Sequence, residues 1–283
     1  MSDGLLAAAA IGEESERQTA PFGRRLLTVV GMDELGAYHV LRVADPDGPG
    51  RQVPRPGQFA MLAAAERWGG GEDERPYLAR AFSVARRRDG EAHYLLEDVG
   101  PGTKRLCQLR AGEQVWALGP LGQGFTAPRD GRRALLVGGG VGIAPLAIWQ
   151  DELGAQATAL LGFRGAAHAP GASLLQGARV ATEDGSVGHR GLVTELLTDE
   201  LDLAADAEVY ACGPPAMLEA IRALCAERQT PAQLALESGM ACGFGACFGC
   251  VVPTVHGLIR LCVEGPVLDA SVLETALVPG AGH

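Results

Sequence analysis

Four cysteines near the C-terminus constrain the fold of this chain more than any other feature. Cys242, Cys247, Cys250 and Cys262 follow the spacing C-x4-C-x2-C-x11-C, so three thiols share one short loop and the fourth comes from a later segment. This spacing is typical of ligands to a [2Fe-2S] cluster. The glycines between the cysteines supply the backbone freedom that a loop around a cluster needs. We therefore predict a [2Fe-2S] cluster on these four thiolates.

Zinc is the alternative metal, although zinc ligands usually occur as two separate hooks rather than three on one loop. Four unliganded buried thiols are the other alternative. The remaining cysteines have different surroundings. Cys107 and Cys225 lie in apolar or helical segments and are interpreted as small core residues. No histidine pairs at ligand spacing, and no nucleophile motif occurs, so we name no catalytic residue.

Length and charge limit the classes of protein to which the chain can belong. Its 283 residues predict two domains with a small appendage, and 47% hydrophobic residues exclude wholesale disorder. The net charge of −10 argues against binding to nucleic acid or to an anionic membrane surface. No apolar run reaches the length of a membrane span, and the first residues lack the basic leader of a signal peptide. We expect a cytoplasmic protein, in which thiols stay reduced.

The pattern of apolar and turn-forming residues changes along the chain. Short β-type runs separated by Gly, Pro and Asp clusters fill residues 26–116 and predict an antiparallel barrel or sandwich. From residue 132, apolar strands alternate with helical stretches, which predicts a parallel α/β sheet. We therefore expect an α/β plus β protein with units at 22–130, 131–228 and 229–283. Residues 1–20 and the loop from Trp68 to Glu74 receive no role.

The segment Arg80-Ala81-Phe82-Ser83 has the chemistry of a flavin nucleotide site. A guanidinium can pair with a diphosphate, an aromatic ring two residues later on a strand can stack on a flavin, and the serine can reach the ring. A strand at residues 94–97 then leads to a turn in which Gly102 and the Thr103 hydroxyl can receive a phosphate. Taken alone, each of these motifs could instead belong to an ordinary edge strand without a ligand.

Together these motifs resemble the ferredoxin-NADP reductase superfamily. The resemblance implies an FAD-binding antiparallel β-barrel followed by a parallel α/β domain for NAD. It also implies a set of residues that hold FAD: Arg80, Ala81, Phe82, Ser83, Leu95, Leu96, Glu97, Gly102 and Thr103.

Two glycine-rich turns resemble the nicotinamide nucleotide site of the same superfamily. The turn at 138–145 has the form G-x-G-x-x-P and contains Gly140, and the turn at 210–217 contains Cys212 and Gly213. The resemblance places Cys212 near the position of hydride transfer, although close packing of a helix on a sheet is the alternative for such turns. Glu183 and Asp184 follow the third strand, where carboxylates would repel a 2′-phosphate, so we expect NAD(H) rather than NADP(H).

The order of barrel, nucleotide domain and cysteine cluster resembles the electron transfer subunit family of class 1B dihydroorotate dehydrogenases over about residues 22–270. The resemblance implies FAD, a [2Fe-2S] cluster and NAD+ as acceptor, a place in pyrimidine (UMP) biosynthesis, and docking on an FMN-containing catalytic subunit in a heterotetramer with two of each. The chain leaves no residues for a barrel of about 250 residues that could oxidise dihydroorotate. Reductase subunits of bifurcating ferredoxin:NADP, sulfite reductase or hydrogenase complexes are alternatives, and so is a non-catalytic electron carrier.

Overall fold

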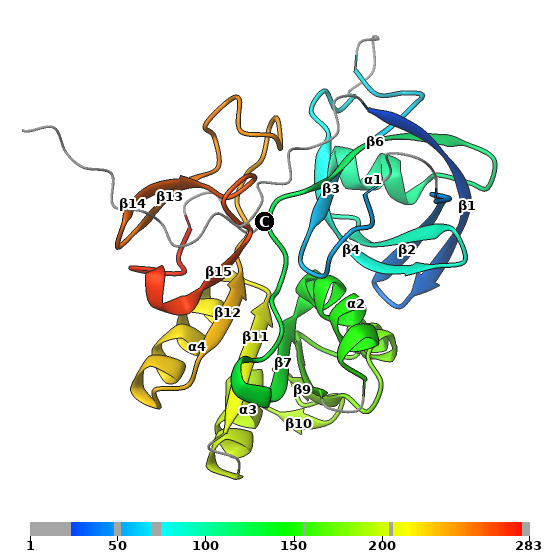
Figure 1. Ribbon diagram of the computed structural model, residues 1–283. Coiled ribbons are helices and arrows are strands. Elements are labelled where there is room, and N and C mark those ends of the chain that lie inside the picture. The colour runs from blue at the N-terminus through cyan, green and yellow to red at the C-terminus, as the bar shows by residue number, and fades with distance from the viewer. Residues whose placement is uncertain (1–23, 48–51, 70–74, 155–156, 204–205, 279–283) are drawn as a thin grey trace, which may run out of the picture.

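The computed structural model describes residues 24–47, 52–69, 75–154, 157–203 and 206–278. The tail at residues 1–20 and most of the loop from Trp68 to Glu74 therefore lie outside the described residues. The described chain forms a β-barrel, an α/β sheet and a small C-terminal unit, which meet near the middle of the view in Figure 1. No helix in these ranges is long and apolar enough to cross a membrane.

The barrel is closed, with strand order β1-β2-β5-β4-β3-β6 and antiparallel pairing throughout. Its strands are β1 (Arg25–Leu35), β2 (Tyr38–Ala44), β3 (Phe59–Ala64), β4 (Arg80–Arg88), β5 (Glu91–Glu97) and β6 (Gln114–Leu121). The pairing of Leu27 with Val115 joins β1 to β6 and closes the barrel. Helix α1 (Pro101–Cys107) packs against β5 and β3. The turn with Gly102 and Thr103 forms the start of this helix.

The second unit is a sheet of seven strands in the order β10-β9-β8-β7-β11-β12-β15. Its strands are β7 (Arg133–Gly139), β8 (Ala157–Phe163), β9 (Arg179–Thr182), β10 (His189–Arg190), β11 (Ala207–Cys212), β12 (Ala232–Ala235) and β15 (Val267–Asp269). All neighbours pair in parallel except β12 and β15. The helices are α2 (Ala144–Leu153), α3 (Val193–Leu203) and α4 (Pro215–Glu227). This is the α/β arrangement that the sequence predicts.

The sheet extends beyond the boundary that we expect at residue 229. Strand β12 is fully buried and pairs with β11, and β15 returns from the cysteine region to pair with β12. A short strand buried on both faces shows no polar alternation, so it has no clear signal in the sequence. The C-terminal unit therefore consists of the segment between these strands, with the hairpin β13 (Val251–Thr254) and β14 (Gly257–Arg260).

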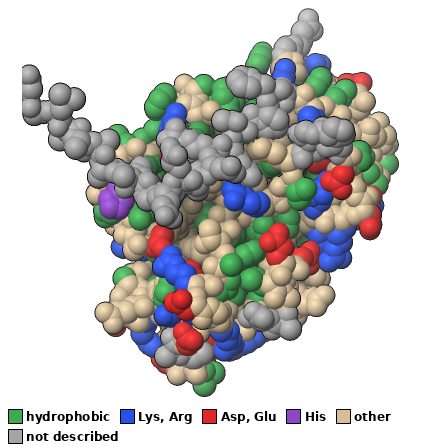
Figure 2. All heavy atoms as spheres, in the orientation of Figure 1, with side chains coloured by type: hydrophobic (Ala, Val, Ile, Leu, Met, Phe, Trp, Pro, Cys, Tyr) green, Lys and Arg blue, Asp and Glu red, His purple; other side chains and the backbone are tan. Residues whose placement is uncertain are grey.

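Side chains from all three units share one continuous core, and a second core joins the barrel to the sheet. Phe59 and Leu121 of the barrel pack in one core with Leu261 of the C-terminal unit and with the sheet. Helix α2 packs against β4, where the Arg86 guanidinium binds the Asp151 carboxylate through Nε at 2.7 Å and Nη2 at 3.2 Å. Basic and acidic side chains are interspersed on the face in Figure 2, so the net charge of −10 does not form one patch there.

Candidate functional site

The four predicted cluster ligands come together as two pairs of thiols. Cys242 and Cys247 contact each other through their side chains, and so do Cys250 and Cys262. Within the described ranges, no three His, Cys, Asp or Glu side chains converge on a point that could hold a single metal ion. Two pairs of thiols suit a two-iron cluster, in which each iron takes two protein ligands.

The backbone of the cysteine loop is arranged to favour thiolates. Burial raises the pKa of Cys242, but the N–H groups of Phe244, Cys247 and Ala246 and the Cys247 thiol outweigh it and lower the pKa to about 7. The N–H of Gly249 donates to Cys247 Sγ at 3.5 Å. Burial, followed by the neighbouring Cys250, raises the pKa of Cys262 to about 12. Positive iron would offset this last cost, because a thiol loses its proton when it binds a metal.

The cysteine loop is seated directly on the barrel. Gly243 has φ of +78°, and a Cβ there would lie 2.5 Å from Met61 Cγ and 3.2 Å from Leu121 Cδ1. Met61 is on β3, and its partner across to β4 is Ala81 of the predicted flavin segment. The cysteine loop and the flavin segment are thus separated by one strand. Only glycine permits this approach, because any side chain at position 243 would push the loop away.

The structure brings Arg80 to the start of α1. A Cβ on Gly102 would lie 2.6 Å from Arg80 Nε and 2.8 Å from Cζ, so the guanidinium covers this glycine. The Thr103 hydroxyl is used within the turn: it accepts from the N–H groups of Val99 and Gly100, both at 3.0 Å, and donates to the Gly100 carbonyl. The contact of this hydroxyl with a phosphate stays a prediction. The Thr103 backbone N–H lies in the first turn of α1, where helix N–H groups have no partner within the helix.

The other residues expected at the flavin lie on β4 and β5 around Arg80. Leu95 and Leu96 are only 2% and 0% exposed, because their side chains pack in the cores, so they can meet a cofactor only through their backbone. Phe82 is half-buried and packs against the barrel core. The Glu97 carboxylate lies 3.0 Å from His168 Nε2 and thereby joins the barrel to the nucleotide domain.

The two expected nucleotide turns lie side by side at the carboxyl ends of β7 and β11. Gly138 pairs with Cys212 in the parallel register. A Cβ on Gly142 would lie 2.5 Å from the Cys212 carbonyl carbon and oxygen, so the turns touch backbone to backbone. Gly140 has φ of +56° with open space where a Cβ would be. Adjacent carboxyl ends of parallel strands are the usual place for a nucleotide in this class of fold.

The Cys212 thiol is fully buried at the end of β11. Burial raises its pKa well above the ordinary value, and the Glu237 carboxylate raises it further. The side chain is therefore a neutral thiol at physiological pH. We predict that it shapes the nucleotide turn rather than reacting as a nucleophile, because only the thiolate is nucleophilic.

Similarity to known proteins identifies the family of this chain. The family model for the iron-sulfur cluster binding domain of dihydroorotate dehydrogenase B matches residues 237–274. The dihydroorotate dehydrogenase B (NAD(+)) electron transfer subunit of Desulforamulus reducens is 38% identical over 76% of this chain and 85% of its own. The Clostridium acetobutylicum subunit is 34% identical over 77% and 86%. This chain belongs to the dihydroorotate dehydrogenase B electron transfer subunit family.

Solved structures of similar fold agree with this family. A chain of the NADH-dependent reduced ferredoxin-NADP oxidoreductase aligns over 91% of this chain and 93% of its own, with a TM-score of 0.72 and 24% identity. The ferredoxin reductase of carbazole 1,9a-dioxygenase covers 74% of this chain and 66% of its own, with a TM-score of 0.61 and 20% identity. At these identities the similarity shows the fold alone, and it is the reductase fold that the sequence motifs predict.

Sequence reasoning missed the residues that join the units of this family's fold. Met61 connects the cysteine loop to the flavin strand, and Gly142 lets the two nucleotide turns touch. Met61 belongs to no local motif, and each of the two residues acts through a neighbour that is distant in the sequence. The sequence shows that Gly142 belongs to a glycine-rich turn, but it does not show that this glycine lies against the backbone of Cys212.

Proposed function

We propose that this chain is the subunit that passes electrons from a partner FMN dihydroorotate dehydrogenase, through a [2Fe-2S] cluster and FAD, to NAD+ in pyrimidine (UMP) biosynthesis. The observation that carries the proposal is the contact of the cysteine loop with Met61, which pairs with Ala81 on the neighbouring strand. It brings the candidate one-electron centre next to the candidate flavin strand. The name of the Desulforamulus reducens relative, a dihydroorotate dehydrogenase B (NAD(+)) electron transfer subunit, supports NAD+ as the acceptor.

Each cofactor has a set of residues suited to it. Cys242, Cys247, Cys250 and Cys262 would hold the cluster, Arg80 and the start of α1 would hold the FAD diphosphate, and Gly140 and Gly213 would face the dinucleotide. When bound, these groups supply one-electron and hydride chemistry, so the protein needs no acid or base of its own. The chain contributes positions, backbone N–H groups around sulfur, and packing that excludes water.

The partner and its stoichiometry belong to the same proposal. The partner is an FMN-containing catalytic subunit, and the complex is a heterotetramer with two copies of each chain. We place it in the cytoplasm, where NAD(H) is available and thiols stay reduced.

The direct test is purification with and without the partner, followed by analysis of iron, labile sulfide, FAD and FMN. The isolated chain should contain FAD, should give the spectroscopic signal of a [2Fe-2S] cluster after reduction, and should reduce a dye with NADH. Together with the partner it should reduce NAD+ with dihydroorotate. A chain that binds FAD but reduces no dye would be a carrier rather than a reductase, which would contradict the proposal. A bifurcating reductase would instead require a different partner, and no relative named above at 34–38% identity has such a name.

The acceptor preference can be reversed at Glu183. The residue follows β9, and its neighbour Asp184 is held by the Ser186 N–H at 2.9 Å and by the Ser186 hydroxyl at 2.6 Å. Glu183→Arg should raise the NADPH to NADH ratio of kcat/KM by about tenfold, since a hydrogen bond to a charged group contributes about 1.5–3 kcal/mol. Glu227→Arg makes the same charge change at the end of α4 and should leave the ratio unchanged. Preference for NADPH in the unmodified chain would contradict the assignment.

The exposed ring of Phe248 should be a contact for the partner. Phe248 lies between two cluster ligands, is 62% exposed and has φ of +58°, with the Arg260 guanidinium 5.4 Å from its ring. Rigid exposed aromatic rings contribute disproportionately to interfaces. Phe248→Ala should weaken binding to the partner by about thirtyfold in a titration, since such a residue contributes about 2 kcal/mol. Iron content and dye reduction should not change. Leu203→Ala, at a residue 80% exposed on α3, is the control, and equal affinity of both variants would refute this contact.

A further inference from the structure

Trp68 lies in the segment after β3 to which the sequence assigns no role. It is half-buried and packs against the barrel core, together with Phe82. Its neighbours fix it: the N–H of Gly69 donates to the Pro76 carbonyl at 2.7 Å, and Ala65 N–H donates to Gln114 at 2.9 Å. The indole is therefore held in a defined place on the barrel.

The indole N–H of Trp68 has no hydrogen-bond partner among the described residues. Nε1 is buried from solvent, and no acceptor in this part of the chain takes its proton. A tryptophan can only donate at this atom, and a buried donor without an acceptor is costly. Most buried polar groups are paired, so this N–H is a donor that an acceptor outside the chain could use.

The unpaired donor is next to Arg80. The Arg80 guanidinium lies 5.9 Å from the centre of the Trp68 ring, and the same guanidinium covers Gly102. Among the described residues, the Arg80 guanidinium makes one hydrogen bond, from Nη1 to the Leu78 carbonyl at 2.5 Å. A positive charge and an indole N–H without a partner among the described residues thus lie on neighbouring side chains, and together they suit an anion with several oxygens.

Strand register shows which end of a flavin nucleotide would lie here. β3 and β4 are antiparallel, with Phe59 opposite Ser83 and Leu62 opposite Arg80. The chain that leaves β3 after Ala64 therefore runs past Arg80 on the side away from Phe82 and Ser83. If the isoalloxazine ring lies at Phe82 and Ser83 and the diphosphate at Arg80, Trp68 lies towards the adenosine.

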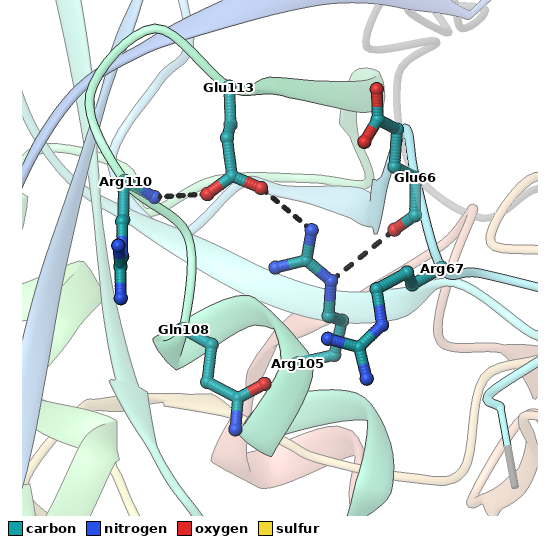
Figure 3. Close-up of a pocket in the computed structure, with 6 residues that line it drawn as sticks. All are labelled: Glu66, Arg67, Arg105, Gln108, Arg110 and Glu113. Carbon is teal, nitrogen blue, oxygen red and sulfur yellow. Dashed lines mark hydrogen bonds and ion pairs between the residues drawn. The ribbon is translucent and has the colours of Figure 1, made fainter. Parts of the chain in front are cut away.

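A pocket of about 500 Å³ lies beside the two residues that precede Trp68. It is lined by Glu66, Arg67, Arg105, Gln108, Arg110 and Glu113. In Figure 3 the buried Arg105 donates from Nη2 to Glu113 at 2.8 Å and from Nε to the Glu66 carbonyl at 3.3 Å. Arg105 thereby ties the segment before Trp68 to α1. Arg67, which precedes the indole, has φ of +57°, a conformation that is costly for a residue other than glycine.

We propose that Trp68 is a further FAD-binding residue whose indole N–H donates to an oxygen in the adenosine monophosphate half of the dinucleotide, beside Arg80. The inference rests on the proposed function, because it needs FAD at Arg80. FMN lacks the adenosine half, so the two flavins distinguish this contact from one to the flavin ring.

The test is Trp68→Phe in the full chain, which keeps an aromatic ring under Arg80 and removes the N–H. Apo-protein is titrated with FAD and with FMN, and binding is followed by quenching of flavin fluorescence. The FAD dissociation constant should rise by about tenfold, the effect of one hydrogen bond to a charged group. The FMN dissociation constant should change by less than about twofold.

Trp116→Phe is the matched control. Trp116 also lies under an arginine, with Arg24 Cζ 5.3 Å from its ring, but on β6 and without an orphaned N–H. It should bind both flavins as the unmodified chain does, and thermal melts of the apo-proteins should coincide. Unchanged FAD affinity in Trp68→Phe, or equal losses for FAD and FMN, would overturn the inference. Absence of FAD binding by the unmodified chain would instead refute the proposed function.

Discussion

Replacing Cys250 with alanine is expected to abolish NAD+ reduction by dihydroorotate in the complex while leaving NADH-dependent dye reduction intact. Cys250 is 3% exposed, and its thiol contacts Cys262, so it forms one of the two thiol pairs. Loss of this thiolate leaves an iron with one protein ligand. The rate between subunits should fall by more than about 100-fold, since loss of even an outer-shell partner of a metal ligand costs about 10- to 100-fold.

Two readouts separate loss of the cluster from loss of the fold. Iron, sulfide and the reduced [2Fe-2S] signal should disappear, whereas FAD content and dye reduction depend on the barrel and the sheet. Cys225→Ala is the matched control, because Cys225 is 1% exposed on α4 and no other cysteine is among the causes of its raised pKa. That variant should keep its iron and its rate and lose only some stability. A Cys250→Ala complex with full iron and full rate would contradict the ligand assignment.

Features encoded in adjacent residues could be predicted from the sequence. The spacing of four cysteines indicated the cluster, because three of the ligands share one loop. Amphipathic segments indicated α3 and α4, and Gly and Pro clusters marked the barrel strands. The sequence left a barrel and a sandwich open, because closure depends on the pairing of β1 with β6, about ninety residues apart in the register Leu27 to Val115.

Features that depend on tertiary contacts could not be predicted from any motif. β12 and β15 enclose the cysteine segment, and their pairing extends the parallel sheet past residue 229. The hydrogen bond from the Gly100 N–H to the Thr103 hydroxyl at the start of α1 was likewise not predicted from the sequence. Trp68 had no motif at all. Its unpaired N–H becomes visible only when the barrel places it beside Arg80.

Gly102→Ala is expected to weaken FAD binding by about 10- to 100-fold while the protein remains folded, since each hydrogen bond to a charged group contributes about 1.5–3 kcal/mol. The new methyl group would lie within 2.6–2.9 Å of three atoms of the Arg80 guanidinium and of no backbone atom among its nearest neighbours. A flexible side chain can move aside at little cost in stability. The displaced guanidinium would no longer lie at the start of α1, where we propose that the diphosphate binds.

A double-mutant cycle tests whether this loss acts through Arg80. Arg80→Ala alone should also weaken FAD binding by about 10- to 100-fold, because it removes the charged donor. If Gly102→Ala acts by displacing Arg80, adding it to Arg80→Ala should cost almost nothing more, and the two losses will be strongly non-additive. Additive losses would show that the methyl group blocks the cofactor directly. Equilibrium titration with FAD, with melting temperatures of the four apo-proteins as a check on folding, distinguishes these results because only an effect mediated by Arg80 vanishes in its absence.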